Sequence, residues 1–273
     1  MSAHLSLALP PRRWPLRRAV GLGLLLLVST FSLLGPWLIG TDPAVQSLAH
    51  SLQPPNPNHW LGTDLLGRDV LARLAHAAQL SLGLALLAAL SAAVPGVLLG
   101  LIAAWRGGAV ERTLVLLADA VLSLPGLLLV LLLAALSPGS LGALYLGLSL
   151  SLWVEYFRVS RAAARPVLAG DAVQASRLLG FGPAYLLRRH LLPALAPLLG
   201  TLLPFSAAQA VLALAALGFI GVGVQPPTPE LGSMMTEFLP FYAEASWLIA
   251  APVALLMLLV LGMMLFVGEE MPE

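Results

Sequence analysis

The chain has 273 residues, of which 59% are apolar and 10% charged, and its formal net charge at pH 7 is +1. Soluble domains carry about 25% charged residues, so this composition excludes a mostly water-exposed surface and indicates a protein embedded in lipid. The absence of cysteine excludes disulfides and thiolate sites, and the absence of lysine excludes the nucleotide-binding loop of an ATPase, whose lysine contacts the terminal phosphates.

The first apolar run, residues 19–39, is long enough to cross a bilayer. At 1.5 Å per residue it spans about 30 Å, the thickness of the hydrocarbon core. Four arginines precede it: Arg12, Arg13, Arg17 and Arg18. A cleaved signal peptide is the competing interpretation, but the run is too long and no small-x-small cleavage site precedes Thr41. We therefore expect a retained transmembrane helix.

Residues 41–79 form the longest polar stretch, and its second half predicts a short helix at the membrane surface. Thr63 or Asp64 can cap the amino end of such a helix. Apolar residues then recur at helical spacing as far as Leu74. This pattern is typical of an amphipathic helix that lies in the interface.

Five further apolar runs raise the expected number of transmembrane helices to about six. They are residues 81–105, 113–136, 141–157, 194–224 and 247–267. Prolines interrupt several of them, at positions 95, 125, 197 and 204. Proline removes a backbone hydrogen bond that neighbouring helices must replace, so kinks in a packed bundle are expected. The fold class is therefore an all-α polytopic membrane protein.

The distribution of arginine predicts the orientation. With the amino terminus inside, twelve of the fourteen arginines lie on the cytoplasmic side, and only Arg68 and Arg73 lie outside. The opposite loop, residues 225–246, contains three glutamates and no arginine. We therefore expect both termini in the cytoplasm.

The largest cytoplasmic loop, residues 158–193, contains the expected functional segment. Asp171 can cap a short helix, Gly180 can supply the left-handed residue that ends it, and Pro183 suits the first turn of the next helix. A helix of about two turns is not stable alone in water. Either a groove on a partner or the inner ends of the bundle must hold it, and the residues alone leave both possibilities open.

The same segment resembles the EAA loop of binding-protein-dependent ABC importer permeases. Gln174-Ala175-Ser176 is followed after three residues by Gly180, and a His-Leu-Leu-Pro sequence occupies 190–193. The family's usual Glu is Gln174 here, and its second Ala is Ser176. In that family the loop forms a coupling helix that sits in a groove of the ATP-binding subunit. The resemblance implies that the residues coupled to this subunit are Asp171, Gln174, Ala175, Ser176, Arg177 and Gly180.

Two more segments resemble the dipeptide, oligopeptide and nickel branch of that family. They are residues 59–70, with the sequence HWLGTDLLGRDV, and residues 219–232, with the sequence FIGVGVQPPTPELG. The resemblance implies a MetI-like, type I ABC importer permease core at 78–273. It is preceded at 1–77 by a cytoplasmic tail, the first transmembrane helix and a periplasmic segment. The ending at 266–271 resembles the family's only loosely.

The resemblance also implies partners, a location and a cargo. The partners are a homologous second permease subunit, two ATP-binding subunits that hold ATP and Mg, an extracytoplasmic substrate-binding protein and membrane lipid, but no nucleic acid. The expected location is the bacterial inner membrane. The cargo is peptides, or nickel and metal-chelate complexes. This chain would bind no cofactor and catalyse no reaction.

Two carboxylates, Asp119 and Glu155, fall within the expected membrane helices. A carboxylate at mid-membrane costs about 3 kcal/mol, so each must face protein or water. They either line a translocation path or tie helices together, with Glu155 reaching the interface beside Arg158. Carboxylates that line a translocation path would suit the alternative function, a secondary transporter or channel that works without ATP. The histidines lack the paired spacing of a metal site, so no metal site is expected.

Overall fold

The computed structural model describes residues 16–267, which form helices joined by turns, with one isolated β-bridge between Thr63 and Asp69. Arg12, Arg13 and the expected family ending after Val267 lie outside these residues. The helices are α1 (Leu16–Ile39), α2 (Val70–Arg106), α3 (Gly108–Leu122), α4 (Gly126–Leu136), α5 (Leu141–Ala169), α6 (Asp171–Leu178), α7 (Pro183–Leu186), α8 (Leu192–Phe219), α9 (Leu231–Phe238) and α10 (Ser246–Val267). Short 3-10 turns occupy Leu48–His50 and Leu239–Phe241, and a π-turn occupies Leu187–Leu191.

Within residues 16–267, helices lie at all six expected spans, and five of these spans are long and apolar enough to cross a membrane if one bent pair is counted as a single span. Helices α1, α2 and α10, and the continuous segment Pro183–Phe219 that includes α8, are long and apolar enough to cross a membrane. Helices α3 and α4 would together make a fifth span, bent by 72° at their break, which contains Pro125. The sixth passage is α5, whose second half carries four charged residues. The expected all-α polytopic fold is confirmed.

The expected surface helix capped by Thr63 or Asp64 is wrong. Helix α2 instead begins at Val70, where the carboxylate of Asp69 caps it by accepting a hydrogen bond from the Ala72 N–H at 2.8 Å. The Asp64 carboxylate instead accepts the N–H groups of Leu66 and Arg68, both at 2.9 Å. Asp64 thereby closes a turn, and the apolar residues up to Leu74 belong to the first turns of a 37-residue helix.

The centre of the bundle is the packing of α2 against α5, which small residues on α2 make possible. A Cβ atom added at Gly96 would lie 2.6 Å from the carbonyl oxygen of Trp153, and one added at Gly100 would lie 2.6 Å from that of Phe157. Buried alanines extend this face along α2. Close approach of backbones through small residues is the usual mode of helix packing in membranes, where dispersion contacts drive association.

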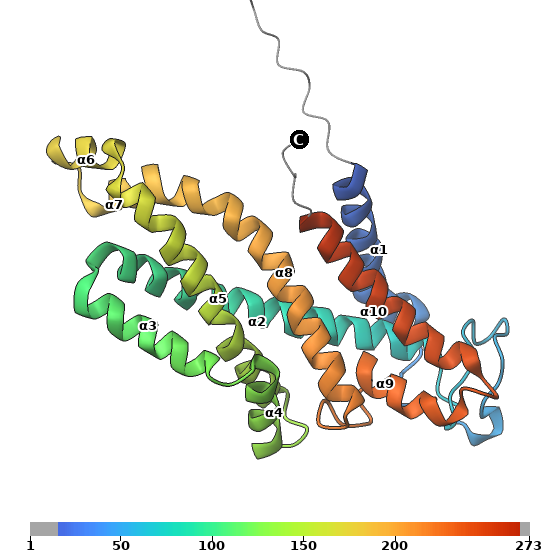
Figure 1. Ribbon diagram of the computed structural model, residues 1–273. Helices are drawn as coiled ribbons and strands as arrows, with labels where there is room; N and C mark the ends of the chain where they lie inside the picture. Colours follow the sequence, from blue (N-terminus) through green and yellow to red (C-terminus); the bar gives the residue numbers. More distant parts are fainter. Residues whose placement is uncertain (1–15, 268–273) are drawn as a thin grey trace, which may run out of the picture.

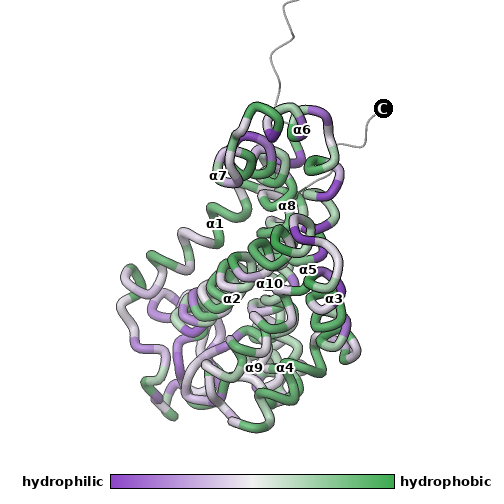
Figure 2. Tube along the Cα trace, turned by 90° about the vertical axis from the view of Figure 1, so that its left-hand side faces the viewer, coloured by the Kyte–Doolittle hydropathy of each residue, from purple (hydrophilic) through white to green (hydrophobic). Residues whose placement is uncertain are grey.

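The polar segments gather at the two ends of the bundle. Figure 1 shows α6 and α7 at one end, together with the start of α1 and the end of α10. The 40–69 segment and α9 lie at the opposite end. The hydropathy colouring in Figure 2 places hydrophilic residues around α6 and in the 40–69 segment, with apolar helices between them. This distribution is typical of a membrane protein whose two polar ends face water and whose apolar middle faces lipid.

Candidate functional site

Helix α6 is a two-turn helix that follows α5 directly. Its N-cap is Gly170, whose carbonyl accepts hydrogen bonds from the N–H groups of Val173 and Gln174. Asp171 is the first helical residue and makes no side-chain cap, so the prediction of Asp171 as the cap is wrong. The Gly170 backbone already supplies the turn, and the Asp171 carboxylate lies in the first turn, where the helix dipole favours a negative charge.

The carboxyl end of α6 is closed by a Schellman motif. Gly180 has a φ of +82°, its N–H donates to the Arg177 carbonyl at 3.0 Å, and the Phe181 N–H donates to the Ser176 carbonyl at 3.1 Å. Glycine adopts this left-handed conformation without the penalty that a Cβ atom brings. The expected helix stop at Gly180 is confirmed, as is Pro183 in the first turn of α7.

One face of α6 is fastened to the rest of the chain. Val173 and Ser176 are its buried residues. The Ser176 hydroxyl donates to the Ala172 carbonyl at 2.8 Å and lies 3.0 Å from Nε2 of His190, in the π-turn that leads into α8. The Arg177 guanidinium lies over the Trp105 ring at 5.7 Å from its centroid. These contacts join α6 to Trp105 at the end of α2 and to His190 in the turn before α8.

The other face of α6 is free. The side chains of Leu178 and Leu179 are 89% and 76% exposed. Next to them, the Phe181 ring stacks on Tyr185 with centroids 4.2 Å apart. Of the predicted residues, Asp171, Gln174, Ala175, Arg177 and Gly180 are exposed, and Ser176 points inward. The predicted residues do lie on one helix, but the prediction missed its two exposed leucines. The sequence signal for them was two consecutive apolar residues directly before the glycine that ends the helix.

Asp119 and Glu155 lie apart from this segment. Asp119 on α3 accepts a hydrogen bond from Arg158 on α5 at 2.6 Å between Nη2 and Oδ1, which ties the two helices. Arg158 therefore pairs with Asp119 and not with Glu155. A second tie joins the same helices, because Arg161 and Arg165 both contact Glu111. For Asp119 the geometry fits a helix tie, and for Glu155 the choice between path and structure stays a prediction.

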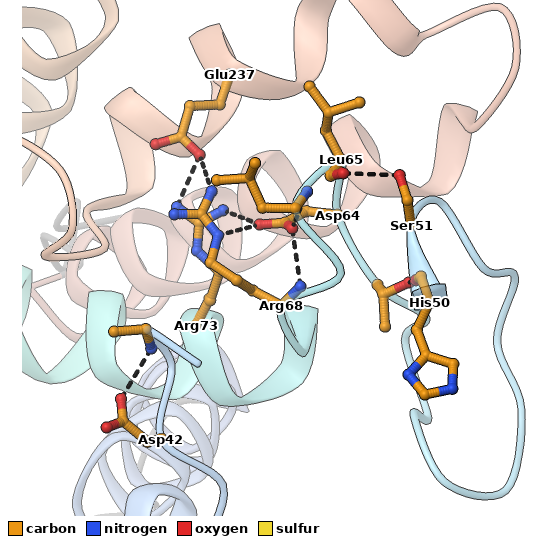
Figure 3. Close-up of polar contacts among 11 residues, drawn as sticks. Asp42, His50, Ser51, Asp64, Leu65, Arg68, Arg73 and Glu237 are labelled. Carbon is orange, nitrogen blue, oxygen red and sulfur yellow. Dashed lines mark hydrogen bonds and ion pairs between the residues drawn. The ribbon is translucent and has the colours of Figure 1, made fainter. Parts of the chain in front are cut away.

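At the opposite end of the bundle lies a group of four charged residues that sequence reasoning did not find, here called the outer ion network: Asp64, Arg68, Arg73 and Glu237. Figure 3 shows their contacts. Both guanidinium groups donate to the Asp64 carboxylate at 2.6 Å and to Glu237 Oε2 at 2.8 Å. Two positive and two negative charges sum to zero, which makes their burial tolerable.

The outer ion network joins two parts of the chain that are far apart in sequence, residues 64–73 and α9. Asp64 and Arg68 belong to the turn before α2, Arg73 to its first turn, and Glu237 to α9. The side chains of Arg73 and Asp64 are 1% and 2% exposed. The sequence did hold a signal: these two arginines were the only ones expected on the outer side.

Another acidic residue, Glu230, caps the amino end of α9. Its Oε2 accepts a hydrogen bond from the Ser233 N–H at 2.9 Å, and the residue is fully buried. A Cβ atom at Gly218 would lie 2.0 Å from this oxygen, so only glycine leaves room for it. Burial raises the pKa of the Glu230 carboxyl above its ordinary value of 4.5, and backbone N–H groups of residues 231–233 partly oppose that rise.

Known proteins with similar sequences are permease proteins of transport systems. The family model described as "Binding-protein-dependent transport system inner membrane component" matches residues 96–270. The dipeptide transport system permease protein DppC of Haemophilus influenzae is 34% identical over 250 residues, covering 89% of this chain and 84% of the relative. The di/tripeptide transport system permease protein DppC of Pseudomonas aeruginosa is 39% identical over 251 residues, covering 89% and 82%.

A solved structure supports the fold. A chain of the MetNI methionine ABC transporter, in an inward-facing crystal form, aligns with a TM-score of 0.55 at 19% identity, over 68% of this chain and 90% of that one. The expected MetI-like architecture is therefore confirmed. The family match extends over most of the chain and includes α6. This chain belongs to the family of inner membrane components of binding-protein-dependent transport systems.

Proposed function

We propose that this chain is a permease subunit that moves peptides across the inner membrane, driven by ATP that separate subunits hydrolyse. The relatives described above are named as permeases of dipeptides and of di- and tripeptides, which favours peptides over nickel or metal chelates. The chain itself catalyses no reaction and holds neither ATP nor Mg. It forms part of the path that the peptide takes through the membrane, and it responds to the conformational changes of the ATP-hydrolysing subunits.

The observation that carries the proposal is the construction of α6. Its inner face is bonded to His190 and stacked on Trp105, while Leu178 and Leu179 project outward without intramolecular contacts that would bury them. A two-turn helix with an exposed apolar tip is suited to entering a groove on another protein. Force on that tip would reach α2 and α8 through the two contacts on the inner face.

The proposed orientation places α6 and both termini in the cytoplasm. Helix α6, the start of α1 and the end of α10 lie at one end of the bundle (Figure 1). Arginines concentrate there, at positions such as Arg106, Arg177 and Arg188, as expected for a cytoplasmic face. In this orientation the outer ion network and α9 face the extracytoplasmic side.

The proposed assembly contains two permeases. A homologous second permease subunit would complete one central path, two ATP-binding subunits would bind at the α6 end, and an extracytoplasmic binding protein would deliver the peptide at the α9 end. Closure of the ATP-binding subunits would push α6 and rearrange the bundle, which gives alternating access. A transporter or channel independent of ATP would have no use for the exposed tip of α6.

The experiment replaces the tip while keeping the helix. Leu178→Gln preserves helix propensity and removes the apolar surface. We expect the variant permease to accumulate in the membrane normally, to recover less ATP-binding subunit on purification, and to lose ATP-dependent peptide uptake. Leu48→Gln is the matched control, because Leu48 is 73% exposed and lies in the 40–69 segment at the opposite end of the bundle (Figure 1).

Two outcomes would contradict the proposal. Normal recovery of the ATP-binding subunit together with normal uptake in Leu178→Gln would refute the role of α6. Uptake that persists when the genes for the ATP-binding subunits are deleted would favour the ATP-independent alternative. Loss of function in Leu48→Gln alone would instead point to the outer face as the sensitive surface.

A further inference from the structure

Two adjoining clefts lie along α1, and they differ in chemistry. The first, about 490 Å³, lies between the end of α1 and the start of α2, and it has polar lining residues at Thr41, Asn58 and Asp69. The second, about 640 Å³, runs between α1 and α10 and is lined almost wholly by apolar side chains. Both are lined by Phe31, Gly35 and Leu38. The two clefts therefore adjoin at these three residues, with a polar head at the end of α1 and an apolar tail between α1 and α10.

The dimensions of this cleft suit a lipid. From Phe31 to Ile39 the helix rises about 12 Å at 1.5 Å per residue, which approaches half of the roughly 30 Å hydrocarbon core. The polar head lies where α1 ends, at the level where phospholipid headgroups lie. Helix α1 is also the span with the least burial in its most apolar window, at 17%. An acyl chain can therefore reach the apolar part from the surrounding bilayer.

The charge of the polar head selects the headgroup. Asp69 is the charged residue that lines it. Its side chain is 6% exposed, and its Oδ1 contacts the Ala72 N–H and its Oδ2 contacts Nδ1 of His59, each at 2.8 Å. No arginine lines this cleft, and the nearby Arg68 and Arg73 are bonded within the outer ion network. An acidic, arginine-free site attracts an ammonium group and repels an anionic headgroup.

An aromatic residue completes the polar head. Trp60 lines the cleft and is 73% exposed. Exposed tryptophans are typical of the interface between water and the hydrocarbon core, and an indole face attracts an ammonium group. We propose that the cleft binds an amine-bearing phospholipid, with its ammonium group between Asp69 and Trp60 and an acyl chain along Leu38, Gly35 and Phe31. This inference does not depend on which cargo is transported.

The test measures lipid binding to the purified, intact transporter by native mass spectrometry. Phosphatidylethanolamine and phosphatidylglycerol are added in turn to delipidated protein. We expect saturable binding that favours phosphatidylethanolamine. Trp60→Ala should weaken it about two- to fivefold, the equivalent of an exposed cation–π contact. Asp69→Asn should weaken it about tenfold, the equivalent of one hydrogen bond to a charged group.

The controls separate lipid binding from folding. Asparagine caps helices about as well as aspartate, so Asp69→Asn keeps the start of α2. Trp37→Ala removes a tryptophan that is 84% exposed on the same helix end but does not line the polar head, and it should bind lipid as the wild type does. Each variant must elute as an intact complex before its lipid binding is compared.

Three results would overturn the inference. The first is equal binding of phosphatidylglycerol, because an acidic head would not accept it. The second is an equal effect of Trp37→Ala and Trp60→Ala. The third is a photo-crosslinker at Leu38 that captures a second permease chain in the membrane and no lipid, which would make the cleft a subunit interface.

Discussion

Replacement of Arg73 by methionine tests whether the outer ion network holds the outer face together. The arginine side chain is 1% exposed and bonds to Asp64 at 2.6 Å and to Glu237 at 2.8 Å. Methionine keeps the unbranched apolar stem of the side chain but leaves the two carboxylates with one guanidinium between them. Breaking a buried ion pair on one side costs about 3–5 kcal/mol, and Arg68 remains in contact with both acids, so we expect about 3 kcal/mol.

The expected loss is large enough to measure by thermal melting. For a chain of this size 1 kcal/mol shifts the melting temperature by about 2–4 °C, so Arg73→Met should melt about 6–12 °C lower. Unfolding of membrane proteins in detergent is commonly irreversible, so all variants are compared at one heating rate by the loss of the monodisperse peak. Arg112→Met, at an exposed arginine of α3, is the control and should change stability by less than about 0.5 kcal/mol.

A second substitution examines the cause. Arg73→Met combined with Glu237→Gln removes the negative charge that lost its partner, and part of the stability should return. If Arg73→Met melts at the same temperature as Arg112→Met, the network does not stabilise this face and the reasoning fails. If the double variant melts lower than the sum of its single effects, unpaired charge is not the reason for the loss.

Three further predictions concern single positions. Because the raised pKa of Glu230 means that the folded chain holds its proton more tightly than the unfolded chain does, stability should fall as the pH rises from about 4.5. Glu230→Gln, which keeps an acceptor for Ser233, should reduce the difference in melting temperature between pH 5 and pH 7. Gly96→Ala should cost about 1–3 kcal/mol in a melt because its Cβ meets the Trp153 carbonyl, whereas Gly83→Ala, with nothing within 4 Å, should be neutral or stabilising. Gly180→Ala, at a φ of +82°, should cost about 1 kcal/mol locally and speed amide exchange at Phe181. Gly182→Ala, at a φ of −77°, is the control and should leave that exchange rate unchanged. Unchanged exchange in Gly180→Ala would refute the strain argument.

The predictions that succeeded rest on local rules. The stop of α6 at Gly180 and the start of α7 at Pro183 depend on residues within one or two turns, and the sequence displays them directly. The same rules failed at Thr63, Asp64 and Asp171. Several residues there can cap a helix, and the choice among them depends on which backbone groups are already bonded in the folded chain.

Long-range partners could not be predicted. Asp64 and Glu237 share two arginines although they lie 173 positions apart in the sequence, and hydropathy contains no information on which loops meet. Asp119 likewise takes its arginine from another helix. The available clue was the presence of two arginines on the expected outer side, where arginine is rare. The structure explains it, because two carboxylates neutralise both arginines.

The outer ion network also imposes an order on biogenesis. In the proposed orientation, Asp64 crosses the membrane together with Arg68 and Arg73, so both positive charges can be partly compensated as soon as they reach the outer side. Glu237 reaches the same side only after α8 has crossed the bilayer. Until then one carboxylate serves two guanidinium groups, and the network itself lacks one negative charge. Closure of the outer face must therefore wait for α9, the second to last α-helix of residues 16–267.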